Sequence, residues 1–99
     1  MLEINMDAVY SLSEDIFLYK IKELDKFWVF NVDSGDHYSL NETSFWILEQ
    51  VDGKSSLKSI LHKYLNEFEI DKKQGEEDFF EIVENFLNEG IIRNGGREK

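Results

Sequence analysis

Residues 30–43 read Phe30-Asn31-Val32-Asp33-Ser34-Gly35-Asp36-His37-Tyr38-Ser39-Leu40-Asn41-Glu42-Thr43. The Asp-Ser-Gly-Asp segment in the middle is a strong hairpin signal, because Gly and Asp tolerate the positive φ that tight turns need. The apolar and aromatic residues on its two sides predict antiparallel strands. Asn41 precedes an apolar-periodic run, so its side chain is expected to cap the first turn of a helix. The chain therefore changes from strands to helices at this point.

Two further strand-like segments lie upstream, at residues 16–21 (Ile-Phe-Leu-Tyr-Lys-Ile) and 27–32 (Phe-Trp-Val-Phe-Asn-Val), with a polar turn between them. Their β-branched and aromatic side chains favour strands. Together with residues 37–40 they predict a sheet of three antiparallel strands joined by two hairpins. Residues 9–12 are a candidate for a further short strand. A three-stranded sheet has two edges, and natural proteins either blunt a sheet edge or use it.

Downstream, apolar residues recur at helical spacing in three segments. We expect a helix over 42–51, a second that Ser55 or Ser56 caps, and a third that begins at an Asp71–Gln74 capping pair and ends before Gly90. The β-β-β-α-α-α order predicts an α+β domain that is winged helix-turn-helix-like, with its helices on one face of the sheet. We place this domain at 16–93, between an N-terminal extension (1–15) and a flexible tail (94–99).

Composition narrows the class of protein. The 99 residues fit one domain, and the absence of cysteine excludes disulfides and thiolate metal sites and favours a reducing compartment. No apolar run reaches the roughly 18 residues that a membrane span needs. Residues 1–15 carry acidic side chains and no Lys or Arg, unlike a signal peptide. We therefore expect a cytoplasmic protein without a membrane partner.

The residues needed for catalysis or metal binding do not occur in a suitable pattern. His37 and His62 lie on different predicted elements, so we expect no metal site. Carboxylates such as Glu77 and Glu81 lie on the polar face of a predicted helix, where they are solvated and not held in a cleft with shifted pKa values. The sequence thus predicts a binding domain that has no catalytic residues and no cofactor.

A winged-helix DNA-binding protein is the first alternative. Lys54, Lys58 and His62 are spaced four apart and form a stripe on the predicted second helix. The net charge of −10 argues against it, and no Lys or Arg occurs from Gln74 to Ile92. The third predicted helix instead carries Glu76, Glu77, Asp78, Glu81, Glu84 and Glu89. Because such a helix repels a phosphate backbone, we expect no nucleic-acid partner.

The apolar positions of the third predicted helix cover an arc of roughly 160°, wider than the roughly 100° that packing on one sheet requires. Ile82 carries the surplus on one flank, and Phe80 and Leu87 carry it on the other. The surplus either touches the other two helices or lines a groove. The sequence leaves both flanks as candidates for such a groove.

Four segments, in order and spacing, resemble the PqqD-type domains. They are residues 30–43, the Ile47-Leu48 and Val51-Asp52-Gly53 end of the first helix, Ser59-Ile60, and the run from Asp78-Phe79 through Ile82-Val83 and Phe86 to Gly90-Ile91-Ile92. The resemblance covers about residues 16–92. Aromatic Trp28 and Phe30 stand where the family often carries Leu, which implies a bulkier sheet here.

The resemblance implies that the chain binds the leader segment of a ribosomally synthesised precursor peptide, as a recognition element and peptide chaperone. It also implies partner enzymes that modify the peptide, such as a radical SAM enzyme, a leader peptidase or a cyclase. In the family the leader adds as a strand beside the third strand and the third helix. The residues implied here are His37, Tyr38, Ser39, Leu40, Asp78, Phe79, Ile82, Val83 and Phe86, with Phe80 and Leu87 as rivals.

Two points complete these expectations: the charge of the expected leader peptide and a second alternative function. The carboxylates on that helix predict a leader that carries Lys or Arg beside its apolar anchors. A scaffold subunit that binds only a maturation enzyme, and no peptide, is the second alternative after DNA binding.

Overall fold

The structure, a computed structural model, describes residues 4–95. Its elements are β1 (Tyr10–Leu12), β2 (Ile16–Ile21), the 3-10 turn η1 (Lys22–Leu24), β3 (Lys26–Asn31), β4 (His37–Leu40), α1 (Glu42–Gln50), α2 (Leu57–Phe68), α3 (Lys72–Asn88) and β5 (Ile92–Asn94). The predicted succession of three strands and three helices is confirmed, and β1 falls on the segment that was a candidate strand. The strand β5 was not predicted.

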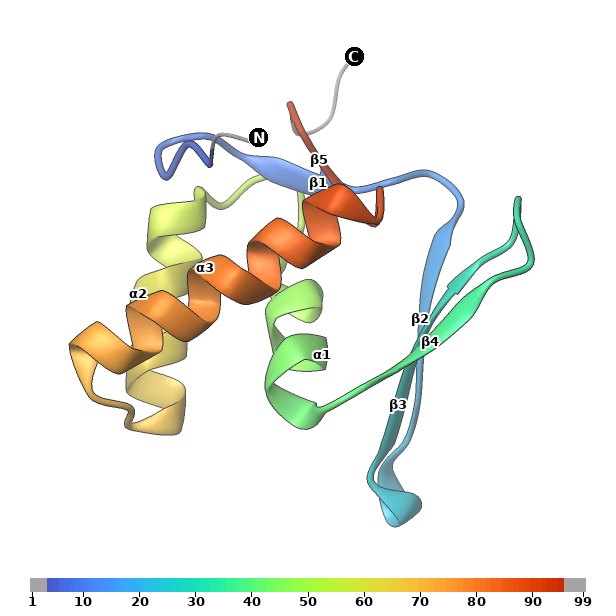
Figure 1. Ribbon diagram of the computed structural model, residues 1–99, viewed down its shortest axis with the longest axis horizontal. Coiled ribbons are helices and arrows are strands. Elements are labelled where there is room, and N and C mark those ends of the chain that lie inside the picture. The colour runs from blue at the N-terminus through green and yellow to red at the C-terminus, as the bar shows by residue number, and fades with distance from the viewer. Residues whose placement is uncertain (1–3, 96–99) are drawn as a thin grey trace.

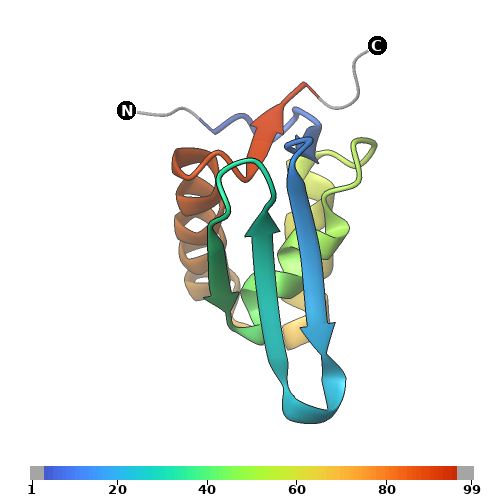
Figure 2. The ribbon, with the colours of Figure 1, turned by 90° about the vertical axis from the view of Figure 1, so that its right-hand side faces the viewer.

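The principal sheet has the order β2-β3-β4, with both pairs antiparallel. Figure 1 shows this sheet nearly edge-on, with the three helices on one side of it. Figure 2 shows the sheet in front of the helices, with α3 beside β4. On the covered face Ile16 and Val29 are buried, and the centroid of the Phe27 ring lies 5.1 Å from the centroid of the Phe45 ring of α1. This face of the sheet and the helices enclose one hydrophobic core.

Each helix begins at a residue whose side chain accepts a backbone hydrogen bond, as expected of an N-cap. Asn41 accepts from Ser44 N–H at 2.9 Å and caps α1. Ser56, rather than Ser55, caps α2, and Asp71 caps α3. The predicted capping box at α3 is only half formed, since the Gln74 side chain donates to Asp78 and not back to residue 71.

A second, two-stranded sheet pairs β1 with β5, so the two ends of the described chain lie side by side. Tyr10 pairs with Asn94 and is almost completely buried. Asn94 therefore lies in a strand, and the expected tail falls outside the described residues from position 96 onward. None of the helices within residues 4–95 combines the length and the apolar character that a membrane span requires.

Candidate functional site

The strand β4 forms an edge of the principal sheet, and its outward backbone groups can be assigned from the hairpin. Asn31 N–H donates to Asp36 O at 2.8 Å, so this pair is hydrogen bonded across the hairpin. Bonded and non-bonded pairs alternate along an antiparallel ladder. Tyr38 and Leu40 therefore direct their backbone groups toward β3, whereas those of His37 and Ser39 point outward. Among the described residues no strand pairs with this outer side of β4.

The side chains of β4 alternate between the two faces of the sheet. Tyr38 and Leu40 point to the face that carries the helices, and His37 and Ser39 point to the opposite face. Between β4, α3 and the start of α1 lies a groove of about 210 Å³. The residues that line it are Tyr38, Leu40, Ser44, Ile82, Asn85, Phe86, Glu89 and Ile91. An open strand edge thus lies directly beside an apolar groove.

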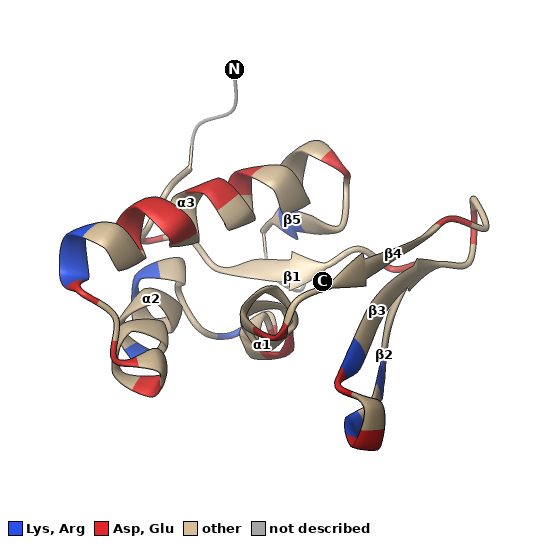
Figure 3. Ribbon diagram, turned by 60° about the horizontal axis from the view of Figure 1, so that its bottom comes forward, with Lys and Arg blue, Asp and Glu red and all other residues tan. Residues whose placement is uncertain are grey.

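The end of the groove beside Tyr38 is acidic. The Tyr38 hydroxyl donates to Glu89 Oε1 at 3.4 Å. Partial burial raises the pKa of this hydroxyl, and the negative charges of Glu89 and Asp36 raise it further. Tyr38 therefore stays protonated at neutral pH and remains a donor to the carboxylate. Figure 3 shows that α3 carries acidic residues along its length and that the β3–β4 turn is also acidic.

The C-terminal end of α3 closes the groove through a Schellman turn. Ile91 N–H donates to Phe86 O at 2.9 Å, and Gly90 N–H donates to Leu87 O at 3.1 Å. Gly90 has a φ of +73°, which a residue with a Cβ adopts at a cost. The turn brings buried Ile91 back against the groove.

The structure brings together part of the set of residues named from sequence. Tyr38, Leu40, Ile82 and Phe86 line the groove. The backbone N–H and C=O groups that point outward from the edge of β4 belong to His37 and Ser39, the residues before and after Tyr38.

The other named positions on α3 lie elsewhere. Phe79 and Val83 are fully buried in the core, so their side chains do not line the groove. Asp78 is half-buried and accepts a bond from Gln74 Nε2 at 3.0 Å. Of the rival positions, Phe80 lines a separate depression against α2, and Leu87 packs against the core.

Four lining residues were not among the site residues predicted from the sequence: Ser44, Asn85, Glu89 and Ile91. Asn85 and Glu89 lie three and seven residues after Ile82, so they share its stripe on the helix. A search for that stripe that admitted polar residues would have found them. Ser44 comes from α1, and no periodicity within α3 indicates it.

The comparisons with known proteins agree with this architecture. A family model described as coenzyme PQQ synthesis protein D (PqqD) matches residues 27–92. A solved structure described as TbiB1 in complex with the TbiA(beta) leader peptide superposes with a TM-score of 0.71 at 15% identity, over 90% of this chain and 99% of that one. A lasso peptide synthetase B1 complexed with the leader peptide gives 0.72 at 19% identity, over 87% and 99%. No curated protein matches by sequence.

Proposed function

The chain belongs to the PqqD family, and on this premise we propose that it binds the leader segment of a ribosomally synthesised precursor peptide and presents the peptide to a modifying enzyme. The leader adds as a strand to β4 and lays alternate side chains into the groove beside α3. The chain supplies no catalytic group in this scheme. The chemistry belongs to the enzyme partner, such as a radical SAM enzyme, a leader peptidase or a cyclase.

The observation that carries the proposal is the open edge of β4 beside the groove. Strand addition uses main-chain hydrogen bonds for affinity and pockets for alternate side chains for selectivity. His37 and Ser39 offer the outward N–H and C=O groups, and the groove takes the side chains of the leader that point toward Ile82 and Phe86. Both structures reported above are complexes with leader peptides, which supports the same use of this fold.

The character of the peptide follows from the lining of the groove. Leu40, Ile82, Phe86 and Ile91 favour apolar anchors, and Glu89 at the Tyr38 end favours a Lys or Arg. Since the chain as a whole carries a charge of −10, a basic peptide is also attracted from a distance. The same charge disfavours a DNA partner.

A direct binding experiment tests the function. Leader segments of candidate precursor peptides, taken from the reading frames that flank that of this chain, are labelled fluorescently and titrated with the purified protein at low and at high NaCl, and duplex DNA is titrated in parallel. We expect saturable leader binding that weakens with salt, because exposed charge pairs are screened, and no DNA binding. Leader binding that is absent while the enzyme still binds would favour the scaffold alternative, and retention of DNA would favour the winged-helix alternative.

A further inference from the structure

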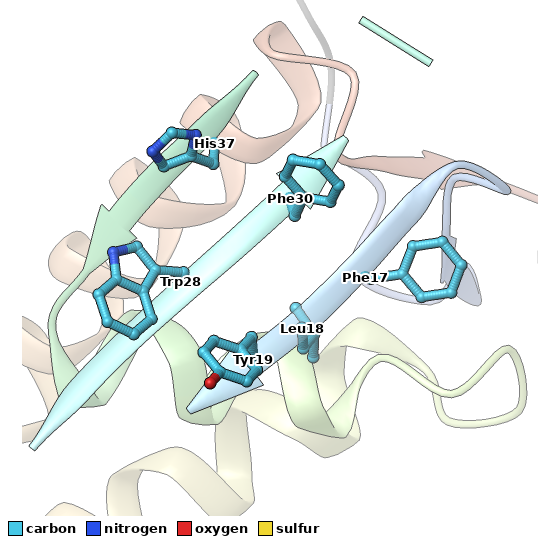
Figure 4. A pocket seen from close by; sticks show the side chains of 6 residues that line it. All are labelled: Phe17, Leu18, Tyr19, Trp28, Phe30 and His37. Carbon is cyan, nitrogen blue, oxygen red and sulfur yellow. The ribbon is translucent and has the colours of Figure 1, made fainter. Parts of the chain in front are cut away.

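The face of the principal sheet that points away from the helices is aromatic. Phe17, Tyr19 and Phe30 are 55%, 57% and 38% exposed. Figure 4 shows their rings with those of Trp28 and His37 along the three strands, and the helices lie behind the sheet. Together with Leu18 these residues line a shallow depression of about 510 Å³. We call this surface the outer aromatic face.

The strand register orders these rings into two rows across the sheet. Tyr19 pairs with Trp28, which pairs with Ser39, and Phe17 pairs with Phe30, which pairs with His37. The Tyr19 and Trp28 rings are stacked with centroids 5.6 Å apart, and the Phe30 and His37 rings lie 6.4 Å apart. These two ring contacts restrict the side chains involved, which lowers the side-chain entropy lost when a partner covers them.

An antiparallel sheet with one wet face normally alternates apolar residues toward the core with polar residues toward water. Here the wet face is aromatic as well, although the core is enclosed on the other side of the sheet. Exposed apolar residues that are contiguous mark an interaction surface, whereas scattered ones need no explanation. The outer aromatic face is contiguous over three strands, so it calls for a partner.

The position of the outer aromatic face relative to the edge of β4 limits the choice of partner. His37 and Ser39 contribute their side chains to this face and their outward backbone groups to the edge of β4. A leader added at β4 covers only the strip beside that strand. The strand β2 would lie about 14 Å from such a leader, three strand spacings of about 4.8 Å. Phe17 and Tyr19 therefore need an occupant other than the leader.

Charge argues against a second copy of this chain, since two molecules that each carry −10 repel one another. The six residues that line the depression include no Asp or Glu. Asp33 and Asp36 are exposed in the β3–β4 turn at one end of the face. The complementary surface of the partner is therefore apolar at its centre and basic where it meets this turn.

We propose that the outer aromatic face is the docking surface for the enzyme that modifies the peptide. The inference rests on the proposed function, because it places the enzyme beside the edge that holds the leader. An enzyme seated on Phe17, Tyr19 and Phe30 lies next to the alternate side chains of an added strand. The complex thereby holds the leader between two proteins while the rest of the precursor reaches the active site.

The test uses the full chain and a purified candidate modifying enzyme, such as a radical SAM enzyme, a leader peptidase or a cyclase, from the same flanking reading frames. In the double variant Phe17→Thr/Tyr19→Thr both rings are replaced by a residue that favours strands. We expect its affinity for the enzyme to fall at least about tenfold, as for loss of central aromatic anchors, while leader affinity stays within about twofold. Tyr19→Thr alone is the second variant, and unchanged thermal unfolding shows that either one is folded.

The matched control is Phe80→Thr, which removes an exposed aromatic ring from the helical side of the molecule. Its affinity for the enzyme should equal that of the wild type. Enzyme affinity that survives in the folded double variant would overturn the proposal. A wild-type dimer that the double variant converts to monomer in sedimentation would assign the face to a second copy instead. Leader affinity of the wild type is measured separately, so failure of the proposed function is recognised on its own.

Discussion

Ile82 and Phe80 lie on opposite flanks of α3 and face different parts of the molecule. Ile82 lines the groove together with Tyr38 and Phe86, whereas Phe80 faces α2 and the N-terminal segment around Met6. Phe80 is exposed, whereas Ile82 is half-buried and packs against the core, so the stability of each variant is measured together with its affinity. This pair of residues therefore allows a matched comparison at the scale of single side chains.

Replacing Ile82 by Ser should weaken leader binding by about 1–2 kcal/mol, the transfer free energy of most of an apolar side chain. The same change at Phe80 should leave leader affinity unaltered, because its ring lies outside the groove. Fluorescence anisotropy with labelled leader measures both affinities, and urea unfolding confirms that both variants are folded. Equal losses in the two variants would contradict the assignment of the groove to the Ile82 flank.

Only some of the α3 residues that match the family pattern line the groove. Phe79 and Val83 match that pattern but are fully buried in the core. A periodic pattern gives the angle between side chains around a helix, but not the rotation of the helix against its neighbours. That rotation depends on the packing of α3 against α2 and β5. Contacts between such separate segments cannot be predicted from the local sequence pattern of one helix.

Asp52 gives a stability prediction that depends on pH. Its carboxylate accepts from Lys54 N–H at 2.8 Å and Ser55 N–H at 2.9 Å in the link between α1 and α2. These backbone hydrogen bonds lower its pKa below the ordinary value of 3.8. A carboxyl whose pKa is lower in the folded state stabilises the fold above its unfolded pKa, and that stabilisation is lost as the pH falls through the folded pKa.

Asp52→Asn should therefore be less stable than the wild type near neutral pH, and the difference should shrink as the pH falls below 3.8. Urea unfolding of both proteins over a series of pH values measures it. A difference in the free energy of unfolding that does not change with pH would show that the charge of Asp52 has no part in holding this turn.

At the scale of elements, β4 is short but does two things. Its bonded residues hold it to β3, and its outward residues remain available for an added strand. The hairpin that precedes it is fixed by Asn31, whose side chain accepts from Asp33 N–H at 2.9 Å and Ser34 N–H at 3.1 Å. Because this turn sets the register, it also decides which residues of β4 point outward.

Ser39→Pro should weaken leader binding strongly and change stability little. Proline removes the outward N–H of residue 39, while the bonds of Tyr38 and Leu40 to β3 remain. The loss of one main-chain bond and the fit around it should cost about 1–2 kcal/mol of binding. Ser39→Ala, which keeps the N–H, is the control and should bind as the wild type does. Equal affinities of the two variants would exclude strand addition at this residue.

The strands and helices of the central part of the chain could be predicted because their signals are local: alternating or helical periodicity, caps and a hairpin turn. The edge strand β4 was predicted with its observed limits. The strand β5 was not, because it is only 3 residues long and depends on its pairing with β1 at the other end of the chain. Such a short segment carries too few residues for a periodic signal.

At the scale of the whole molecule, the helices cover one face of the sheet, and within residues 4–95 no element covers the other face or pairs with the β4 edge (Figure 2). The groove lies on the helical side of β4. The outer aromatic face, whose side chains Figure 4 shows, lies on the other side. The two surfaces meet at one strand. A leader bound at that strand would therefore touch the groove with one set of alternate side chains and an enzyme with the other.

Hydrogen exchange of the β4 amides tests the central claim most directly. In the free protein the N–H groups of Tyr38 and Leu40 are bonded to β3 and should exchange slowly, whereas those of His37 and Ser39 point outward and should exchange fast. With saturating leader, strand addition predicts that the His37 and Ser39 amides become slow as well, at a rate set by leader dissociation. If both amides exchange as fast in the saturated complex as in the free protein, the leader does not bind as an added strand on β4.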